Sequence, residues 1–160
     1  RGRRYDEQMQ VLKRLWAEET VDFEGEFDTI QGVGLNPLPV QRPIPMWIGA
    51  RGTPAQSVIR RIGQLSNGWF VLCSPEEFPD VRDSIFAEAE AAGRSSDELG
   101  QEAGVAVVGP RQTEWKDRVI GWKQMGLSHL CLRTLGGKLD AAQHLTTLEQ
   151  AVSEIPDEAR

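Results

Sequence analysis

The chain has 160 residues, of which 39% are hydrophobic and 26% charged, proportions typical of a globular domain with a buried core. Its net charge of −6 argues against nucleic acid or an anionic membrane as a partner, because both select surfaces rich in lysine and arginine. No apolar run approaches the roughly 20 residues that a membrane-spanning helix needs. We therefore expect a cytoplasmic protein that acts on a small-molecule substrate.

The first part of the chain is predicted to be a helix followed by an irregular excursion. Apolar residues recur every three or four positions from Tyr5 to Trp16, a spacing that places one helical face against a core. Residues 21–30 alternate apolar and acidic side chains and predict a short exposed hairpin or an extended excursion. Residues 32–45 are rich in glycine and proline, which excludes regular structure. We interpret residues 20–45 as an extended insertion loop before the first strand.

The rest of the chain repeats a strand followed by a helix four times. Apolar runs predict buried strands at residues 45–49, 68–72, 103–108 and 130–132. Helices are expected after Thr53 and Pro54, after Ser74, over residues 113–125, and after Asp140. Strands joined in this way form a parallel α/β sheet with right-handed crossovers. An open doubly wound sheet fits this pattern, and so does half of a (β/α)8 barrel, which needs about 250 residues when complete.

Metal and disulfide chemistry are not expected. The sequence has two histidines and no CxxC motif, HExxH motif or His/Cys cluster. Cys73 and Cys131 lie in or at the end of apolar strand-like runs, which favours buried thiols over a disulfide.

Several segments, taken in order, resemble one known family. They include residues 1–8 (RGRRYDEQ), residues 35–49 (LNPLPVQRPIPMWIG), residues 67–70 (NGWF) and residues 126–130 (GLSHL). Together they resemble luciferase-like monooxygenases, particularly the members that depend on coenzyme F420. The resemblance covers nearly the whole chain and implies the C-terminal half of a (β/α)8 TIM barrel, with strands 5 to 8 and helices 4 to 8. Residues 1–160 would then form a single partial domain, with an N-terminal half expected upstream.

The resemblance implies an oxidoreductase that transfers hydride with coenzyme F420, with FMN and a monooxygenase reaction as the alternative. The family holds the cofactor phosphate at the turn after its fifth strand. The N-terminus of the helix expected after this turn and the guanidinium group of Arg51 also favour binding of an anion, on physical grounds alone. The alternative interpretation of Gly49 and Gly52 is that they form a tight turn that binds no ligand. The cofactor-binding residues implied by the resemblance are Gly49, Ala50, Arg51, Gly52 and Thr53.

The substrate is expected at the C-terminal ends of the strands, where the active sites of (β/α)8 barrels lie. Arg133 directly follows an apolar strand, so its cation is expected either to contact a ligand or to form a structural ion pair. Val108 to Arg111 borders the same end of the sheet. The residues predicted to face the substrate are Cys73, Ser74, Arg133 and Thr134.

Three further expectations concern activity and assembly. Cys73 is expected to pack rather than act as a nucleophile, and His129 and His144 are expected to be structural. The resemblance implies that the groups lining the cofactor ring come mostly from the N-terminal half, so residues 1–160 alone are expected to be inactive. A non-catalytic cofactor-binding or structural relative is the alternative from another class. Exposed strand edges in a half barrel favour a homo-oligomer.

Overall fold

The computed structural model describes residues 1–159, and these form two compact units. Unit 1 comprises Arg1–Ile48, Pro54–Gly68 and Asp80–Leu99. Unit 2 comprises Gly49–Thr53, Trp69–Pro79 and the described residues from Gly100 onward. The chain crosses between the units several times, so each unit is assembled from segments that are distant in sequence.

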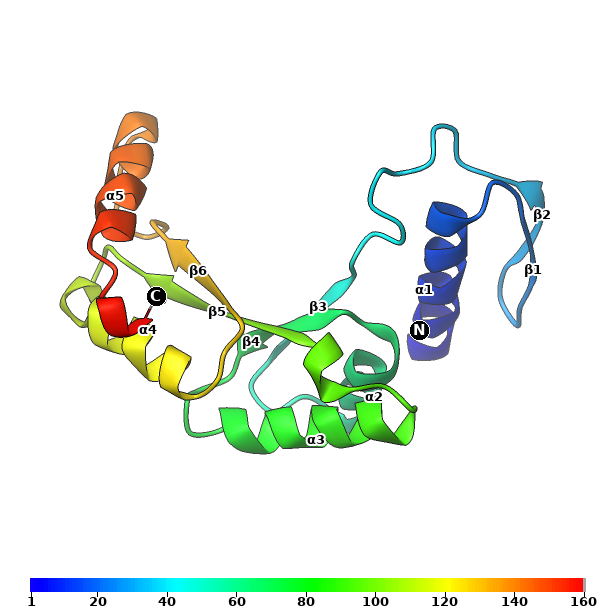
Figure 1. Ribbon diagram of the computed structural model, residues 1–160, viewed down its shortest axis with the longest axis horizontal. Helices are drawn as coiled ribbons and strands as arrows, with labels where there is room; N and C mark the ends of the chain where they lie inside the picture. Colours follow the sequence, from blue (N-terminus) through cyan, green and yellow to red (C-terminus); the bar gives the residue numbers. More distant parts are fainter. Residues whose placement is uncertain (160) are drawn as a thin grey trace. The chain divides into compact units, whose positions relative to one another are not determined.

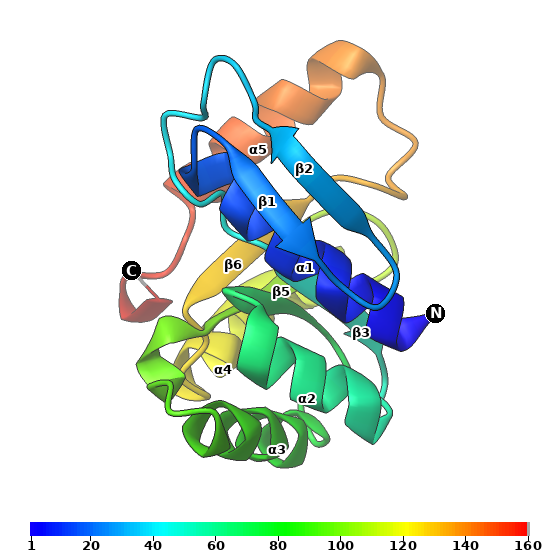
Figure 2. The same ribbon diagram turned by 90° about the vertical axis from the view of Figure 1, so that its right-hand side faces the viewer.

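Unit 1 begins with a helix and a hairpin. Helix α1 (Gly2–Ala17) is followed by the antiparallel strands β1 (Val21–Glu24) and β2 (Thr29–Val33). Figure 2 shows the hairpin beside the helix, and one α1 side chain fixes it there. The Glu7 carboxylate accepts hydrogen bonds of 2.7 to 3.0 Å from three backbone N–H groups of the hairpin turn, those of Glu26, Phe27 and Asp28. The predicted exposed hairpin within residues 21–30 is therefore confirmed.

Two further helices of unit 1 approach each other closely at a glycine. They are α2 (Gln56–Leu65) and α3 (Phe78–Ala91), the latter lying in unit 1 from Asp80 onward. A Cβ added to Gly63 would lie 2.7 Å from the Ile85 carbonyl oxygen and 2.9 Å from the Ala89 nitrogen. Since both atoms belong to the backbone of α3, no side chain can be accommodated at Gly63 without moving one helix away from the other.

We expect Gly63→Ala to lower the free energy of unfolding by about 2 kcal/mol, within the range typical of overpacked cores. The added methyl group meets backbone atoms, which cannot rotate away as a flexible side chain would. Urea unfolding followed by circular dichroism measures the change. Gly121→Ala is the matched control, because a Cβ there meets nothing within 4 Å. Equal stabilities for the two variants would show that the helix contact at Gly63 is not close.

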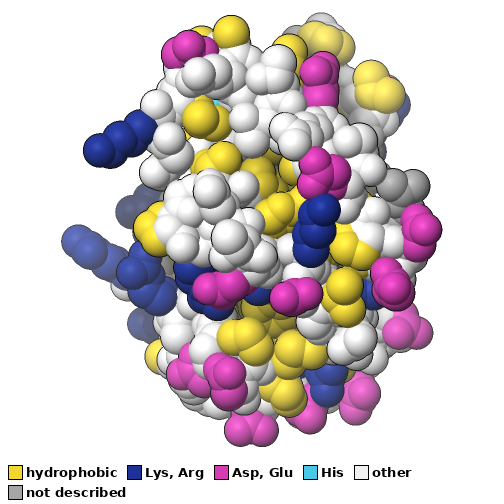
Figure 3. Space-filling view, turned by 90° about the vertical axis from the view of Figure 1, so that its left-hand side faces the viewer, with side chains coloured by type: hydrophobic (Ala, Val, Ile, Leu, Met, Phe, Trp, Pro, Cys, Tyr) yellow, Lys and Arg dark blue, Asp and Glu magenta, His cyan; other side chains and the backbone are white. Residues whose placement is uncertain are grey.

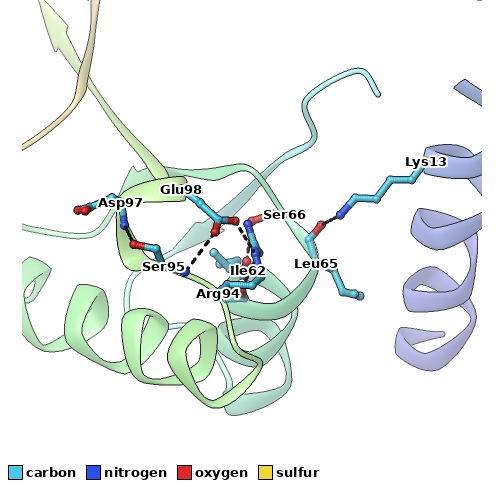
Figure 4. A network of polar contacts seen from close by, with 9 residues as sticks. Lys13, Ile62, Leu65, Ser66, Arg94, Ser95, Asp97 and Glu98 are labelled. Atoms are coloured by element: carbon cyan, nitrogen blue, oxygen red, sulfur yellow. Dashed lines mark hydrogen bonds and ion pairs between the residues drawn. The ribbon is translucent and has the colours of Figure 1, made fainter. Parts of the chain in front are cut away.

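The C-terminal end of α2 is held by side chains from three other positions (Figure 4). The Lys13 ammonium donates to the Leu65 carbonyl at 2.6 Å, and the Arg94 guanidinium donates to the Gly63 carbonyl at 2.6 Å. The Ser66 hydroxyl donates to the Ile62 carbonyl at 2.7 Å. The last carbonyls of a helix lack intrahelical partners and carry partial negative charge, so these donors satisfy the helix end. Burial lowers the pKa of Lys13, and the nearby Arg94 charge lowers it further.

A four-stranded sheet forms the frame of unit 2 (Figure 1). Its strands are β3 (Trp47–Arg51), β4 (Gly68–Leu72), β5 (Gly100–Ala106) and β6 (His129–Arg133), arranged in chain order. Strands β5 and β6 run parallel, with Gly104 opposite Cys131. The predicted α/β class with four parallel strands is confirmed.

Aromatic side chains fill the core of unit 2 on the side of the sheet that the helices cover. Helix α4 (Trp115–Gln124) contacts β5, and helix α5 (Ala141–Ser153) contacts β6. The Phe78 ring stacks on Trp69 at a centroid distance of 5.9 Å and meets the Trp122 ring edge-on at 5.5 Å. Trp69 and Phe78 are fully buried. The tryptophan of the NGWF segment is therefore a core residue.

Several helix boundaries were predicted from capping residues, with mixed outcomes. Asp140 caps α5 through a reciprocal pair of hydrogen bonds with Gln143, as expected. The expected cap at Thr53 and Pro54 is wrong, because Ala55 keeps an extended backbone and α2 begins only at Gln56. The third predicted strand lies at Gly100–Ala106 rather than at residues 103–108.

Helix α5 exposes two of its large apolar side chains. Leu145 and Val152 of α5 are 63% and 56% exposed, and the buried residue is Ala151. Figure 3 shows hydrophobic side chains at the surface between charged ones on this side of the protein. Among the described residues, no helix is both long enough and apolar enough to cross a bilayer.

Candidate functional site

The turn at the C-terminal end of β3 holds the five residues predicted to bind a cofactor. Gly49, Ala50 and Arg51 end the strand, and Gly52 and Thr53 follow it. Gly52 has a φ of +61°, in the left-handed region that side chains rarely adopt, and its N–H donates to the Leu72 carbonyl at 3.2 Å. The turn is thereby fixed to the C-terminal end of β4.

Packing does not require glycine at position 49, and alanine at position 50 does not strain the backbone. A Cβ added to Gly49 would have the Leu72 and Phe70 side chains as its nearest neighbours, at 3.6 and 3.7 Å, which is ordinary van der Waals contact. No described residue therefore requires glycine at this exposed position. Ala50 lies in a strand and does not have a positive φ, so the alanine introduces no backbone strain.

Arg51 is exposed at the end of β3, on the same face of the strand as Gly49. Its guanidinium forms no hydrogen bond or salt bridge with any other residue in 1–159. An arginine that no carboxylate neutralises, beside backbone that carries no side chain, is suited to an anion such as a phosphate. The turn thus combines a cation with accessible backbone, as phosphate binding requires.

The end of β4 carries two of the residues predicted to face the substrate. Ser74 and Glu77 bond reciprocally, with the Ser74 N–H donating to the Glu77 carboxylate at 2.9 Å and the Glu77 N–H donating to the Ser74 hydroxyl at 3.3 Å. This capping pair precedes α3 and orients the loop. Cys73 and Cys131 are half-buried free thiols.

Burial raises the pKa of the Cys73 thiol, and the nearby Glu77 charge raises it further. The thiolate is the reactive form, so a raised pKa means a smaller thiolate fraction at neutral pH than in a free cysteine. We expect alkylation of Cys73 by iodoacetamide at pH 7.5 to be slower than that of a free cysteine, and to accelerate above the ordinary thiol pKa of about 8.5. Mass spectrometry of the labelled peptide measures the rate. Fast labelling that is independent of pH would contradict this assignment.

The Arg133 side chain crosses the neighbouring strand β5 at Gly104. Its guanidinium donates to the Gly104 carbonyl at 2.9 Å, and a Cβ on Gly104 would lie only 2.5 Å from Nε. Glycine at this position of β5 therefore leaves the space that the guanidinium occupies. Within residues 1–159, Arg133 has no carboxylate partner, so the structural ion pair considered as an alternative role does not form there.

A hollow of about 340 Å³ brings most of the predicted substrate-side residues together at the ends of β4, β5 and β6. Cys73, Ser74 and Arg133 all line it, together with Leu72, whose carbonyl accepts a hydrogen bond from the Gly52 N–H. Thr134 does not line this hollow. Its side chain is buried, and its hydroxyl lies 2.7 Å from His144 Nδ1 on α5, a contact that joins the strand end to the helix.

Among the residues that line this hollow, sequence reasoning missed a charged one. Arg118, on α4, lines it beside Arg111 and Arg133. The available signal was its helical position: residue 118 lies three positions after Trp115 and four before Trp122, both of which are buried. A cation on the buried face of an amphipathic helix is unusual enough to mark a candidate site.

Polar side chains join neighbouring strands near their N-terminal ends. The Asn67 side-chain oxygen accepts from the Met46 N–H at 3.0 Å, and the Asn67 N–H donates to the Met46 carbonyl at 2.8 Å. The Ser128 hydroxyl accepts from the Gln101 N–H at 2.7 Å and lies 2.9 Å from His129 Nδ1. Residues 1–159 contain no cluster of His, Cys, Asp and Glu side chains that could hold a metal ion.

The strand–helix repeat and the four-stranded sheet place the chain in the α/β class. A family model described as luciferase-like monooxygenase matches residues 1–153, and the chain belongs to this family.

Curated relatives match a shorter part of the chain. It is 31% identical over 103 residues to an F420-dependent glucose-6-phosphate dehydrogenase of Nakamurella multipartita, a match covering 60% of this chain and 28% of that protein. A second such dehydrogenase, from Kineococcus radiotolerans, is 28% identical over the same length and the same shares. An uncharacterised protein of Mycobacterium tuberculosis is 31% identical over 100 residues, covering 60% of this chain and 32% of that protein. The chain thus matches about a third or less of the length of these relatives.

Solved structures support the fold. An F420-dependent secondary alcohol dehydrogenase, in complex with an F420-acetone adduct, gives a TM-score of 0.61 at 13% identity, over 96% of this chain and 60% of that one. A riboflavin lyase with modified FMN gives 0.67 at 13% identity, over 93% and 57%. These neighbours are luciferase-like TIM-barrel enzymes, and the α/β arrangement of this chain corresponds to part of such a barrel.

Proposed function

We propose that this chain provides the cofactor-phosphate site of an F420-dependent oxidoreductase that transfers hydride between the cofactor and a small-molecule substrate. One observation carries the proposal: among members of the same family, relatives 28 to 31% identical to this chain are F420-dependent glucose-6-phosphate dehydrogenases. The deazaflavin would supply the hydride chemistry, and the protein would position it and exclude water.

The residues at the end of β3 fit a cofactor phosphate. Gly49 offers backbone that is open to approach, and no packing in the described structure demands a glycine there. Arg51 supplies an unpaired guanidinium on the same face of the strand. Gly52 holds the turn in a left-handed conformation, and its own N–H is already used by Leu72. The turn would therefore hold the phosphate through Arg51 and the remaining backbone of residues 49–53.

Apolar side chains next to the turn would shield a bound cofactor from water. Phe70 and Leu72, the nearest neighbours of the Gly49 position, are 37% and 48% exposed. Exposed apolar surface beside an anion site suits a ligand that joins a phosphate to an aromatic ring system, because each part then meets surface of its own kind.

FMN is the second candidate. A riboflavin lyase with modified FMN is one of the solved structures that share the fold of this chain. Both cofactors carry a phosphate, so Arg51 and the β3 turn serve either one.

Equilibrium titration distinguishes the two cofactors. The full-length product of the gene that encodes this chain is titrated with F420 and separately with FMN, and absorbance and fluorescence are recorded. The proposal predicts saturable binding of F420 that is tighter than binding of FMN. Tighter binding of FMN would transfer the assignment to that cofactor. If neither binds below about 1 mM, the weak end of specific affinity, the oxidoreductase proposal is wrong and a non-catalytic relative is favoured.

We also propose that the protein forms a homo-oligomer. The exposed apolar side chains of α5, Leu145 and Val152, support this, because apolar surface of this kind is favourable to cover. Size-exclusion chromatography with light scattering measures the mass directly.

A further inference from the structure

The hollow at the ends of β4, β5 and β6 contains an unusual concentration of positive charge. Arg111, Arg118 and Arg133 all line it, and they come from three different segments: the loop after β5, helix α4 and the end of β6. The chain as a whole carries a net charge of −6. The charge of this cluster is therefore opposite in sign to the net charge of the chain.

Carboxylates neutralise this cluster only in part. The Arg111 guanidinium donates to Glu114 at 2.7 Å, and both side chains are exposed. Among residues 1–159, neither Arg118 nor Arg133 forms a salt bridge, and the one hydrogen bond of Arg133 goes to a backbone carbonyl. Glu76 lies near the same arginines, in the adjoining hollow that Arg111 and Arg118 also line. Within residues 1–159, two of the three guanidinium groups thus form no salt bridge with a carboxylate.

Placing the three cations together has an electrostatic cost. Burial lowers the pKa of Arg118, and the charges of Arg111 and Arg133 lower it further, whereas Glu114 opposes the shift. Like charges in a partly buried hollow repel one another, and a bound anion removes that repulsion. A bound anion would therefore stabilise the three arginines in this arrangement.

Two further features shape the hollow for a ligand. Gly104 leaves room for the Arg133 guanidinium to lie over β5, where any larger residue would displace it. The Ser74 hydroxyl lies at the same hollow, and it is a donor as well as an acceptor. Guanidinium groups bind phosphate and carboxylate through paired hydrogen bonds, and a hydroxyl complements them.

We propose that Arg111, Arg118 and Arg133 form an anion site that binds the phosphate or carboxylate group of the substrate. This inference rests on the proposed oxidoreductase function, because it assigns the hollow to the substrate and the β3 turn to the cofactor.

The test is calorimetric titration of the full-length gene product with inorganic phosphate at constant ionic strength, without cofactor. Arg118→Gln is expected to weaken phosphate binding about tenfold or more, as loss of a charge-assisted hydrogen bond does. Arg111→Gln, at an exposed position that tolerates substitution, is expected to weaken it in the same direction. Arg60→Gln is the matched control, because Arg60 is exposed on α2, outside the hollow, and the charge change is the same.

Each outcome decides the proposal. Phosphate affinity that is equal in wild type, Arg118→Gln and Arg111→Gln would overturn it. The same variants are then titrated with F420, and unchanged affinity is expected. A parallel loss of F420 affinity would show that the cluster holds the anionic groups of the cofactor, and the substrate assignment would be wrong. Arg118-dependent phosphate binding in a protein that binds neither F420 nor FMN would keep the anion site and reject the proposed function.

Discussion

Phe78→Ala is expected to lower the free energy of unfolding by about 3 to 5 kcal/mol, the range for removing a buried phenylalanine. Phe78 is fully buried, and its ring lies between Trp69 and Trp122. Alanine would leave a cavity bordered by two indole rings, which are held by a strand and a helix and cannot collapse into it without moving both. Burial and two aromatic contacts are lost together.

Urea unfolding followed by tryptophan fluorescence suits this measurement, because two of the tryptophans contact the substituted ring. Phe27→Ala is the matched control, since Phe27 is 41% exposed in the hairpin of unit 1. A surface substitution of this kind is expected to change stability by about 0.5 kcal/mol. A loss below about 1 kcal/mol for Phe78→Ala would show that the three rings do not form the core of unit 2.

Arg51→Ala is expected to weaken cofactor binding by about 1 to 3 kcal/mol, which is roughly tenfold for each 1.4 kcal/mol. The guanidinium is exposed and has no partner in residues 1–159, so its loss leaves no buried group unsatisfied. We therefore expect the melting temperature to stay the same while cofactor affinity falls.

Arg51→Lys separates charge from geometry in the same titration. Lysine keeps the positive charge but lacks the planar pair of donors, so an intermediate affinity is expected if the arginine binds phosphate through two hydrogen bonds. Arg60→Ala, which removes an arginine of α2, is expected to leave the affinity unchanged. If Arg51→Ala binds the cofactor with wild-type affinity, Arg51 does not contribute to cofactor binding.

The strand positions could be predicted because buried parallel strands leave a local signature. Continuous apolar runs such as residues 68–72 stand out in the sequence, and β4 has these bounds in the structure. Helix starts were harder, since a capping residue and a proline also occur in extended turns. The Thr53–Pro54 pair shows this, because the chain stays extended through Ala55 before α2 begins.

The candidate site could be predicted only where it follows the ends of strands. Cys73, Ser74 and Arg133 were found because each comes directly after or at the end of an apolar run, and the structure places all three at one hollow. Arg118 could not be found in this way, because it lies on a helix and reaches the hollow only through the packing of α4 on β5. Thr134 follows the same strand as Arg133, but its side chain turns to His144 on α5.

The most direct test of the account is a crystal structure of the full-length gene product with F420 bound. The account predicts the cofactor phosphate within hydrogen-bonding distance of the Arg51 guanidinium and of backbone N–H groups in residues 49–53. A cofactor phosphate held by Arg118 and Arg133 instead, with the β3 turn empty, would contradict it.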